Sequence, residues 1–172
     1  MSAAALKIIP TPDPLSSKFA ELGIETVTYE HRPVFTVGEG EDIKAQIPGG
    51  HTKNLFLKDK KDKIWLVTAL DETVIDLKKL PARINAARLS FGSAPLMEAV
   101  LGVTPGSVTP LALLNDTHRQ VSPVLDHNLM AHELMNCHPL RNDRTTALKP
   151  QDLVKFMKNL GYDPLIVDFS RL

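Results

Sequence analysis

The sequence predicts one domain of mixed α/β (α+β) class. Short segments with the two-residue alternation of strands are interleaved with segments that have helical periodicity, and no repeat or linker separates them. The chain has 172 residues, of which 43% are hydrophobic and 23% charged. A domain of this length buries roughly 68–70% of the surface of its unfolded chain, so it needs no metal or disulfide to fold. We therefore expect residues 1–172 to form a single domain.

The N-terminal part predicts an irregular lead-in followed by a helix. Residues 1–12 have no periodic pattern. Apolar residues then recur at Leu15, Phe19 and Leu22, which is the i, i+4, i+7 spacing of one helix face. Gly23 follows directly after these residues. A residue with left-handed backbone conformation, usually glycine, is common at the end of a helix. The pattern predicts a short amphipathic helix here.

A strand, a polar helix and a hairpin are predicted next. Alternation over 26–30 indicates a strand, and a polar helix is expected over 38–47, ended by proline and glycines. Apolar residues concentrate at 55–57 and 64–70, on either side of the charged segment 59–62. Two apolar segments that flank a short polar turn are typical of a β-hairpin.

Two helical segments are predicted in the middle of the chain. Leu77 and Leu80 indicate the first, which we expect to be broken near Pro81. The second has Ser93 as its N-cap and ends at Gly102.

The C-terminal half predicts mainly short strands and one further helix. Residues 150–161 combine an initial proline, one apolar face and a final glycine, which is typical of a helix. The remaining expectations, in order, are a turn-rich loop over 102–110 and strands over 111–114, over 121–125, within 133–148 and over 166–169.

Composition excludes several classes of protein. There are 20 Lys+Arg and 20 Asp+Glu, so the formal net charge is zero, whereas proteins that coat nucleic acid by neutralising phosphates carry a basic excess. The single cysteine, Cys137, cannot form an internal disulfide. The first residues lack the pattern of a secretory signal, and no apolar run approaches the ~20 residues that span a membrane. We expect a soluble cytoplasmic protein without a membrane partner.

General catalytic motifs are not satisfied. His132-Glu133 begins like a zinc-peptidase motif, but position 136 is asparagine instead of histidine. The six histidines lack compact metal-ligand spacing, so no metal is expected. Cys137 and His138 would point to opposite faces of a strand and could not act as a nucleophile–base pair. The glycines match no nucleotide-binding motif, and no cofactor is expected.

Two features remain as candidate functional elements. Lys53 begins a strand that becomes strongly apolar, and the loop from Gly106 to Pro110 could hold backbone N–H groups toward a ligand. Each has a simpler explanation. Charged residues are mostly exposed, and a glycine-proline loop is often a tight surface connection.

A resemblance to a known family favours a functional role for both features. The sequence TKNLFL at 52–57, GVTPGSVTP at 102–110, LLND at 113–116 and CHPLRNDRTTAL at 137–148 resemble the YbaK/ProX family of aminoacyl-tRNA editing domains. Within it, the chain is most similar to the free-standing, prolyl-tRNA-synthetase-associated branch, whose members deacylate alanyl-tRNA(Pro). The resemblance extends from the helix near residue 15 to the strand near residue 166.

The resemblance implies a fold and a site. The fold is a mixed, barrel-like β-sheet with surrounding helices. Lys53 matches the essential lysine of the family, while Gly106 and Pro110 match its Gly-x-x-x-Pro loop, so these three are the expected catalytic residues. Ser107 stands where other members have a second glycine. The expected substrate-binding residues are Asn54, Ser107, Val108, Thr109, His138, Asn142, Thr145 and Thr146.

The activity implied by the resemblance is hydrolysis of the ester in mischarged aminoacyl-tRNA. Backbone N–H groups of the loop would stabilise the oxyanion, Lys53 would anchor the terminal phosphate or adenosine, and the vicinal 2′-hydroxyl of the substrate would help to orient water. The implied partners are the acceptor end of tRNA(Pro) and, transiently, prolyl-tRNA synthetase or elongation factor. Two alternatives remain open: a non-catalytic module of the same fold that binds tRNA or another nucleic acid, and a DNA-binding protein.

Overall fold

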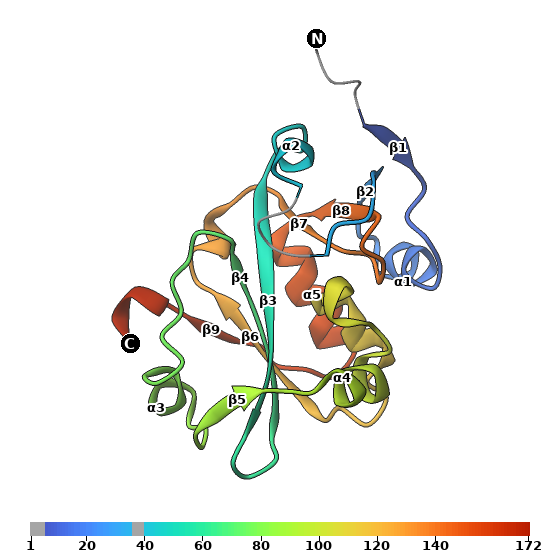
Figure 1. Cartoon of the computed structure of the whole chain (residues 1–172). Coiled ribbons are helices and arrows are strands. Elements are labelled where there is room, and N and C mark those ends of the chain that lie inside the picture. Colours follow the sequence, from blue (N-terminus) through green and yellow to red (C-terminus); the bar gives the residue numbers. More distant parts are fainter. Residues whose placement is uncertain (1–5, 36–39) are drawn as a thin grey trace.

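The strands of the chain form one curved, mixed sheet in the computed structural model, which describes residues 6–35 and 40–172 (Figure 1). The strands run in the order β1-β2-β8-β7-β3-β4-β6-β9, and β5 pairs with β3 beside this path. Their bounds are β1 Lys7–Ile9, β2 Val27–Glu30, β3 Gly50–Asp59, β4 Ile64–Leu70, β5 Leu89–Phe91, β6 Val121–Asp126, β7 Met135–Cys137, β8 Arg144–Leu148 and β9 Leu165–Val167.

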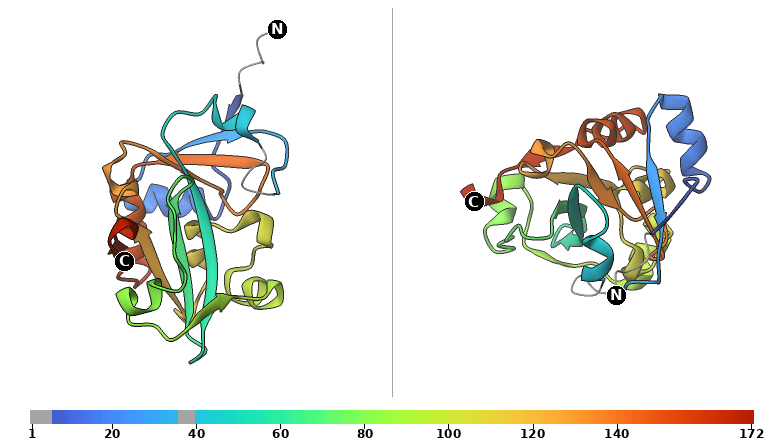
Figure 2. Two further views of the ribbon diagram at one scale, coloured as in Figure 1. Left: turned by 60° about the vertical axis from the view of Figure 1, so that its left-hand side comes forward. Right: turned by 90° about the horizontal axis from the view of Figure 1, so that it is seen from above.

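The sheet is mixed because three of its pairings are parallel. These are β3 with β7, β4 with β6, and β6 with β9, whereas the other pairs are antiparallel. Figure 2 shows that β8 runs across the direction of β3, so the sheet bends where β7 joins β3. Segments from the two ends of the chain therefore meet: β2 pairs with β8 over Val27–Glu30 and Arg144–Leu148.

Helices surround this sheet, and their ends follow the expected capping chemistry. The α-helices are α1 Leu15–Leu22, α2 Glu41–Lys44, α3 Leu80–Ile84, α4 Ala94–Leu101 and α5 Pro150–Asn159. The 3₁₀-helices are η1 Pro105–Ser107, η2 Pro110–Asn115, η3 Leu129–Ala131 and η4 Phe169–Arg171. Ser93 caps α4, since its side chain accepts a hydrogen bond from the N–H of Leu96. Gly23 and Gly102 end α1 and α4 with φ of 68° and 66°.

The strand β4 is buried on both faces and separates two hydrophobic clusters. Leu66 and Leu70 face the larger cluster, which α1, α4 and α5 cover. Trp65 and Val67 face the smaller cluster, where α3 and the C-terminal segment pack. A strand with two covered faces needs apolar residues at consecutive positions, which accounts for the apolar run that only Thr68 interrupts.

The expected fold class is confirmed, and most elements lie where the sequence predicts them. The helices over 15–22, 94–101 and 150–159, the hairpin of β3 and β4, and the short strands β7 and β8 all agree with expectation. Of the helix expected over 38–47, the structure describes only residues from 40 onward, and α2 covers Glu41–Lys44.

Four expectations about local structure are wrong. The lead-in contains β1, because Lys7–Ile9 pairs with β2. Pro81 lies in the first turn of α3, which begins at Leu80, and does not break a helix, since proline fits the first helical turn. Residues 111–114 lie in the 3₁₀-helix η2, where a proline at the first position and a side-chain cap favour a turn over a strand. The final strand stops at Val167, and Phe169 begins η4.

The sequence patterns also miss one strand. Leu89–Phe91 pairs with β3 as β5, but three residues are too short a segment to show periodicity. Among the helices that the structure describes, none is both long and apolar enough to cross a membrane.

Candidate active site

A small pocket lies at the N-terminal end of β3 and has a volume of about 140 Å³. Segments that are distant in sequence form its wall, so it exists only in the folded chain. Among the expected site residues, the wall contains Lys53, Asn54, Gly106, Val108, His138 and Thr145.

Two glycines allow β3 to begin close to its neighbours. At Gly49, φ is +105° and a Cβ atom would lie 2.8 Å from the carbonyl O of Leu134. At Gly50, a Cβ would lie 2.8 Å from Leu70 Cδ2. The backbone contact and the positive φ exclude a side chain at Gly49, whereas a side chain at Gly50 would require Leu70 to shift. Both glycines therefore favour the β3–β7 pairing that places the following residues beside the pocket.

Lys53 is partly buried and its ammonium group is held by the backbone. Its Nζ donates a hydrogen bond to the carbonyl O of Thr73, in the turn after β4. The Cα of Lys53 lies opposite Ala69 in the β3–β4 pairing. An ammonium group has three N–H donors, so this contact leaves two for a ligand in the pocket.

Asn54 connects β3 to the loop after α4. Its Nδ2 donates to the carbonyl O of Val108 at 3.1 Å, and its Oδ1 accepts from the hydroxyl of Thr68 at 2.7 Å. The carbonyl can only accept, which fixes the orientation of the amide. Lys53 and Asn54 leave β3 on opposite faces and contact different segments, yet both belong to the pocket wall.

The loop over 102–110 divides into residues at the wall and residues behind it. Gly106 and Val108 line the pocket, whereas Ser107, Thr109 and Pro110 are buried and do not belong to its wall. The N–H of Ser107 donates to the carbonyl O of Thr104, in the same turn, at 2.9 Å. Thr109 Oγ1 accepts from the N–H of Leu111 at 3.2 Å. These three residues therefore support the conformation of the loop.

Gly106 has space around it. A Cβ atom there would lie 3.5 Å from Phe35 Cδ1 and 3.6 Å from Asn142 Nδ2, which are ordinary contact distances. Asn142 thus lies beside Gly106, although it does not belong to the pocket wall. The protein itself tolerates a small side chain at this position, so a requirement for glycine would come from a bound ligand.

His138 is a neutral hydrogen-bonding group at the pocket. Its Nδ1 lies 3.0 Å from the carbonyl O of Arg144. Because the carbonyl accepts, Nδ1 carries the proton and Nε2 retains a lone pair. Burial, chiefly, lowers the pKa of His138 from its ordinary value, and the nearby His31 and Lys44 lower it further.

The two neighbouring threonines of β8 point in different directions, as alternation along a strand requires. Thr145 lines the pocket and its hydroxyl lies 2.8 Å from His31 Nε2. Thr146 is fully buried away from the pocket wall, and its hydroxyl lies 2.8 Å from that of Thr28. The structure therefore brings Thr145 to the site but not Thr146.

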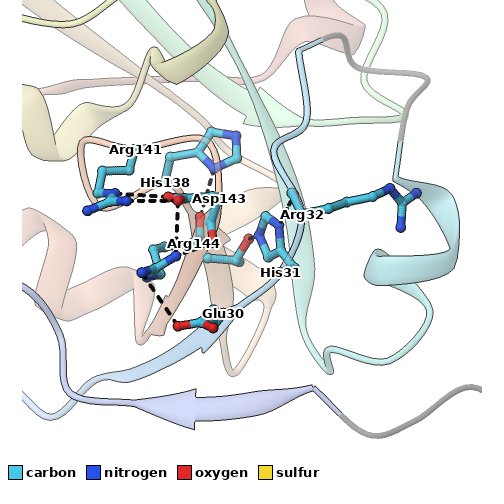
Figure 3. Close-up of polar contacts among 8 residues, drawn as sticks. Glu30, His31, Arg32, His138, Arg141, Asp143 and Arg144 are labelled. Atoms are coloured by element: carbon cyan, nitrogen blue, oxygen red, sulfur yellow. Dashed lines mark hydrogen bonds and ion pairs between the residues drawn. The ribbon is translucent and has the colours of Figure 1, made fainter.

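Ion pairs surround the segment that carries His138 and Thr145 (Figure 3). Asp143 accepts from Arg141 at 2.8 Å and lies 3.1 Å from Arg144, which also approaches Glu30 at 3.5 Å. Arg32 turns toward α2, where it pairs with Asp42. Each arginine has a carboxylate partner, so the surface beside the pocket carries charges of both signs.

Sequence reasoning missed several polar residues of the pocket wall. They are His31, Lys44, His51, Thr52, Asp71 and Asn136. Lys44 Nζ pairs with Asp71 Oδ2 at 2.5 Å, which joins α2 to the end of β4. The available signals were weak: Asp71 directly follows the apolar run of β4, and His51 directly precedes the TKNLFL motif.

Cys137 lines the pocket but is not activated. Burial raises the pKa of its thiol to about 12, so the thiolate is scarce at neutral pH. No hydrogen bond joins Cys137 to His138 in the described part of the chain, and the thiol lies 4.0 Å from the carbonyl O of Thr146. In residues 6–35 and 40–172, no cluster of three or more His, Cys, Asp or Glu side chains is arranged to hold a metal ion.

Known proteins resemble this chain in sequence and in fold. The chain is 38% identical over 169 residues to "Prolyl-tRNA synthetase associated domain-containing protein 1" from Danio rerio, covering 97% of this chain and 92% of the relative. It is also 38% identical over 146 residues to "Prolyl-tRNA editing protein ProX" from Acetoanaerobium sticklandii, covering 84% and 89%.

Solved structures share the fold at low sequence identity. A candidate trans-editing enzyme for prolyl-tRNA synthetase superposes with a TM-score of 0.68 at 16% identity, covering 94% of this chain and 98% of that chain. The hypothetical protein APE2540 superposes with a TM-score of 0.73 at 15% identity, covering 90% and 97%.

A family profile matches the part of the chain that contains the whole pocket. The profile describes the aminoacyl-tRNA editing domain and matches residues 31–156, from the histidine that contacts Thr145 to the last helix. With this match and the similarity to the Danio rerio and Acetoanaerobium sticklandii proteins, the chain belongs to the aminoacyl-tRNA editing domain family.

Proposed function

We propose that this protein is a trans-editing aminoacyl-tRNA deacylase, that residues 1–172 form one editing domain, and that the substrate is alanyl-tRNA(Pro). The observation that carries the proposal is the meeting of Lys53, the Gly106–Val108 segment and His138 at one small pocket in a member of the editing family. The relative named as a prolyl-tRNA editing protein supports the choice of tRNA(Pro).

The reaction is hydrolysis of the ester between the amino acid and the terminal ribose. Water adds to the ester carbonyl and loses a proton, and the tetrahedral intermediate carries an oxyanion. The acyl C–O bond then breaks, and the ribose oxygen takes up a proton and leaves as a hydroxyl. Backbone N–H groups are suitable oxyanion donors because they are already fixed in place. Since the N–H of Ser107 donates within its own turn, the donors we assign are those of Gly106 and Val108.

Lys53 binds and orients the substrate. Its ammonium group is held at Thr73 O and retains two N–H donors, which suits a terminal phosphate or the polar edge of the adenosine. Cys137 is buried with a high pKa, so the proposed reaction uses water as its nucleophile, oriented with the help of the substrate's 2′-hydroxyl. His138, neutral and with a lone pair on Nε2, accepts a hydrogen bond from the substrate or from that water.

We propose that the pocket selects the amino acid by size. A small pocket can exclude the proline ring sterically while it admits the methyl group of alanine. The opposite selection is weak, because each missing methylene costs only ~0.8 kcal/mol of binding. We therefore expect hydrolysis of alanyl esters, and of seryl or glycyl esters at lower rates, with no hydrolysis of prolyl esters.

The partner is the acceptor end of tRNA, met in the cytoplasm after release from prolyl-tRNA synthetase or in competition with elongation factor. The zero net charge and the paired arginines beside the pocket favour weak, short-lived contact with the tRNA backbone. Rapid release suits an enzyme that samples many correctly charged tRNAs.

The test is deacylation of a panel of aminoacyl-tRNAs under single-turnover conditions. We expect loss of alanine from alanyl-tRNA(Pro) and stable prolyl-tRNA(Pro). Equal rates on both would contradict selection by size. Binding of alanyl-tRNA(Pro) without any hydrolysis would support the non-catalytic module instead.

Lys53→Ala identifies the site within that assay. We expect the loss of one charged hydrogen-bonding group to lower kcat/KM about 10- to 100-fold, while the thermal unfolding midpoint changes little because Lys53 is partly exposed. Lys60→Ala, in the exposed turn of the hairpin, is the matched control and should retain full activity. Unchanged turnover in Lys53→Ala would show that this lysine is not part of the active site.

A further inference from the structure

The carbonyl that holds Lys53 belongs to a turn with a specific internal support. Residues 70–73 form a turn closed by the hydrogen bond from Thr73 N to Leu70 O at 3.1 Å. The side chain of Thr73 donates to Asp126 Oδ2, while its backbone carbonyl accepts from Lys53. Thr73 is therefore hydrogen-bonded to Asp126 through its side chain and to Lys53 through its backbone carbonyl.

Asp126 is a fully buried carboxylate at the end of β6. Its exposed fraction is 0%. Its Oδ2 also accepts from the N–H of Leu70 at 3.1 Å, and its Oδ1 accepts from the N–H of Asn128 at 2.9 Å. Burial of a carboxylate is costly unless hydrogen bonds compensate for the lost water. Two of the three donors come from the 70–73 turn, so the carboxylate fixes both ends of that turn.

Two other buried aspartates have similar chemistry in other places. Asp59 accepts backbone N–H groups in the hairpin turn, and Asp116 accepts from Gln120 N, Val121 N and the hydroxyl of Tyr162. Both are 4% exposed. In the described part of the chain, neither forms a hydrogen bond with a residue of the pocket wall, so they stabilise turns without a connection to Lys53.

We propose that Asp126 is a positioning residue for Lys53. It holds the turn over 70–73 so that the Thr73 carbonyl fixes the ammonium group, which then presents its two remaining N–H donors to the substrate. This inference rests on the proposed function, because it assigns to Asp126 a role in the orientation of a substrate-binding lysine.

Replacement of Asp126 by asparagine keeps the size of the side chain and removes one acceptor. The new amide NH₂ faces either the donors of the turn or the N–H of Asn128, so at least one N–H loses its acceptor. In either orientation the neutral amide oxygen is also a weaker acceptor for the turn than the carboxylate. The turn loosens and the Thr73 carbonyl no longer has a fixed place. We expect kcat/KM of the folded protein to fall about tenfold or more.

A double-mutant cycle separates positioning from general stability. If Asp126 acts through Lys53, then D126N should lower single-turnover deacylation strongly in the wild-type background and by less than about twofold in the K53A background. An equal loss in both backgrounds would overturn the proposal. D116N is the matched control: it should lower the unfolding midpoint in the same way as D126N while activity per folded molecule stays near the wild-type value.

Thr73 gives a second test that does not depend on a buried carboxylate. T73V removes the hydroxyl that reaches Asp126 and should lower kcat/KM, whereas T73S retains the hydroxyl and should restore it. Equal activity of T73V and T73S would count against the proposal. Failure of the wild-type protein to deacylate any aminoacyl-tRNA would refute the proposed function itself. In that case, the lysine Nζ resonance of Lys53 in NMR would still report whether D126N, and not D116N, releases the ammonium group.

Discussion

Asn54 in β3 and Val108 in the loop after α4 are joined by a hydrogen bond from Nδ2 to the carbonyl O, 3.1 Å long. The strand that carries Lys53 and the loop that carries the proposed oxyanion donors are therefore held together directly. Thr68, at the same level of β4, donates to the other end of the Asn54 amide. Movement of either segment would change the distance between the two halves of the site.

The Thr68 hydroxyl should matter for activity although it lies outside the pocket wall. Thr68→Val keeps the shape of the side chain but removes the bond to Asn54 Oδ1, so the amide can rotate away from Val108. We expect roughly a fivefold to tenfold loss of kcat/KM and a loss of about 1 kcal/mol in the free energy of unfolding. Deacylation rates and urea unfolding of Thr68→Val and Thr68→Ser check this. Retention of full activity by Thr68→Val would show that the loop is held without Asn54.

Gly106→Ala should separate ligand approach from folding. The added Cβ meets only ordinary contacts, and the φ of Gly106 is not in the left-handed region. We expect the free energy of unfolding to stay equal or to rise by about 0.4–1 kcal/mol, because alanine restricts the unfolded chain. Deacylation should fall, since the methyl group occupies the place where the ester approaches the backbone. Thermal unfolding and kcat/KM are the two measurements, and a fully active Gly106→Ala protein would argue against an oxyanion site there.

His138 should make both activity and stability depend on pH. Its pKa in the folded protein lies below its ordinary value of 6.5, chiefly because of burial. Between these two values the unfolded chain binds more protons, so stability is complete above about pH 6.5 and decreases as the pH falls through the folded-state pKa. Activity of the folded protein should decrease at lower pH, as the pH approaches the folded-state pKa and Nε2 takes up a proton.

His138→Asn is the control for this pH dependence. Asparagine can still donate to the carbonyl of Arg144, but it does not titrate. Urea unfolding and deacylation measured from about pH 7.5 to about pH 5 should show a smaller acid loss in the variant than in the wild-type protein. His31 also lies at the pocket and remains in both proteins, so the difference between the two curves belongs to His138. Identical curves would show that His138 does not titrate in this range.

Cys137 should be chemically inert in the folded protein. Its thiol has a pKa of about 12 and is buried, so iodoacetamide at about pH 7.5 should not modify it until urea unfolds the chain. Cys137→Ala should keep deacylation near the wild-type rate at a cost of roughly 1 kcal/mol in stability. Mass spectrometry and single-turnover rates test both statements. Rapid modification of the native protein with loss of activity would indicate that the thiol takes part in the reaction.

Regular patterns in the sequence predicted the fold well where one physical signal dominated. The apolar run of β4 predicted a buried strand, and the cap residues Ser93 and Gly102 predicted the helix between them. The 111–114 segment was mistaken for a strand because consecutive buried leucines suit a covered strand as well as a buried 3₁₀-helix. There the proline at position 110 and the cap from Thr109 decided the outcome.

The candidate site was predictable from motifs but not from spacing. Lys53, Gly106 and His138 came from resemblance to a family, and the fold brings them to one pocket. The motif that contains Thr145 and Thr146 could not indicate which threonine faces the pocket, since that depends on the register of β8 with β2. Asp126 lies in no motif, and its connection to Lys53 depends on the packing of a turn against a distant strand end.

The pairing of β2 with β8 also determines when the pocket can exist. The contact between His31 and Thr145 joins residues 114 positions apart, and that between Thr28 and Thr146 spans 118 positions. A growing chain on the ribosome cannot make these contacts until β8 has emerged, so every shorter nascent chain lacks one wall of the site. Contacts of such long sequence separation are also entropically expensive to close, and they favour slow folding in which the pocket is completed late.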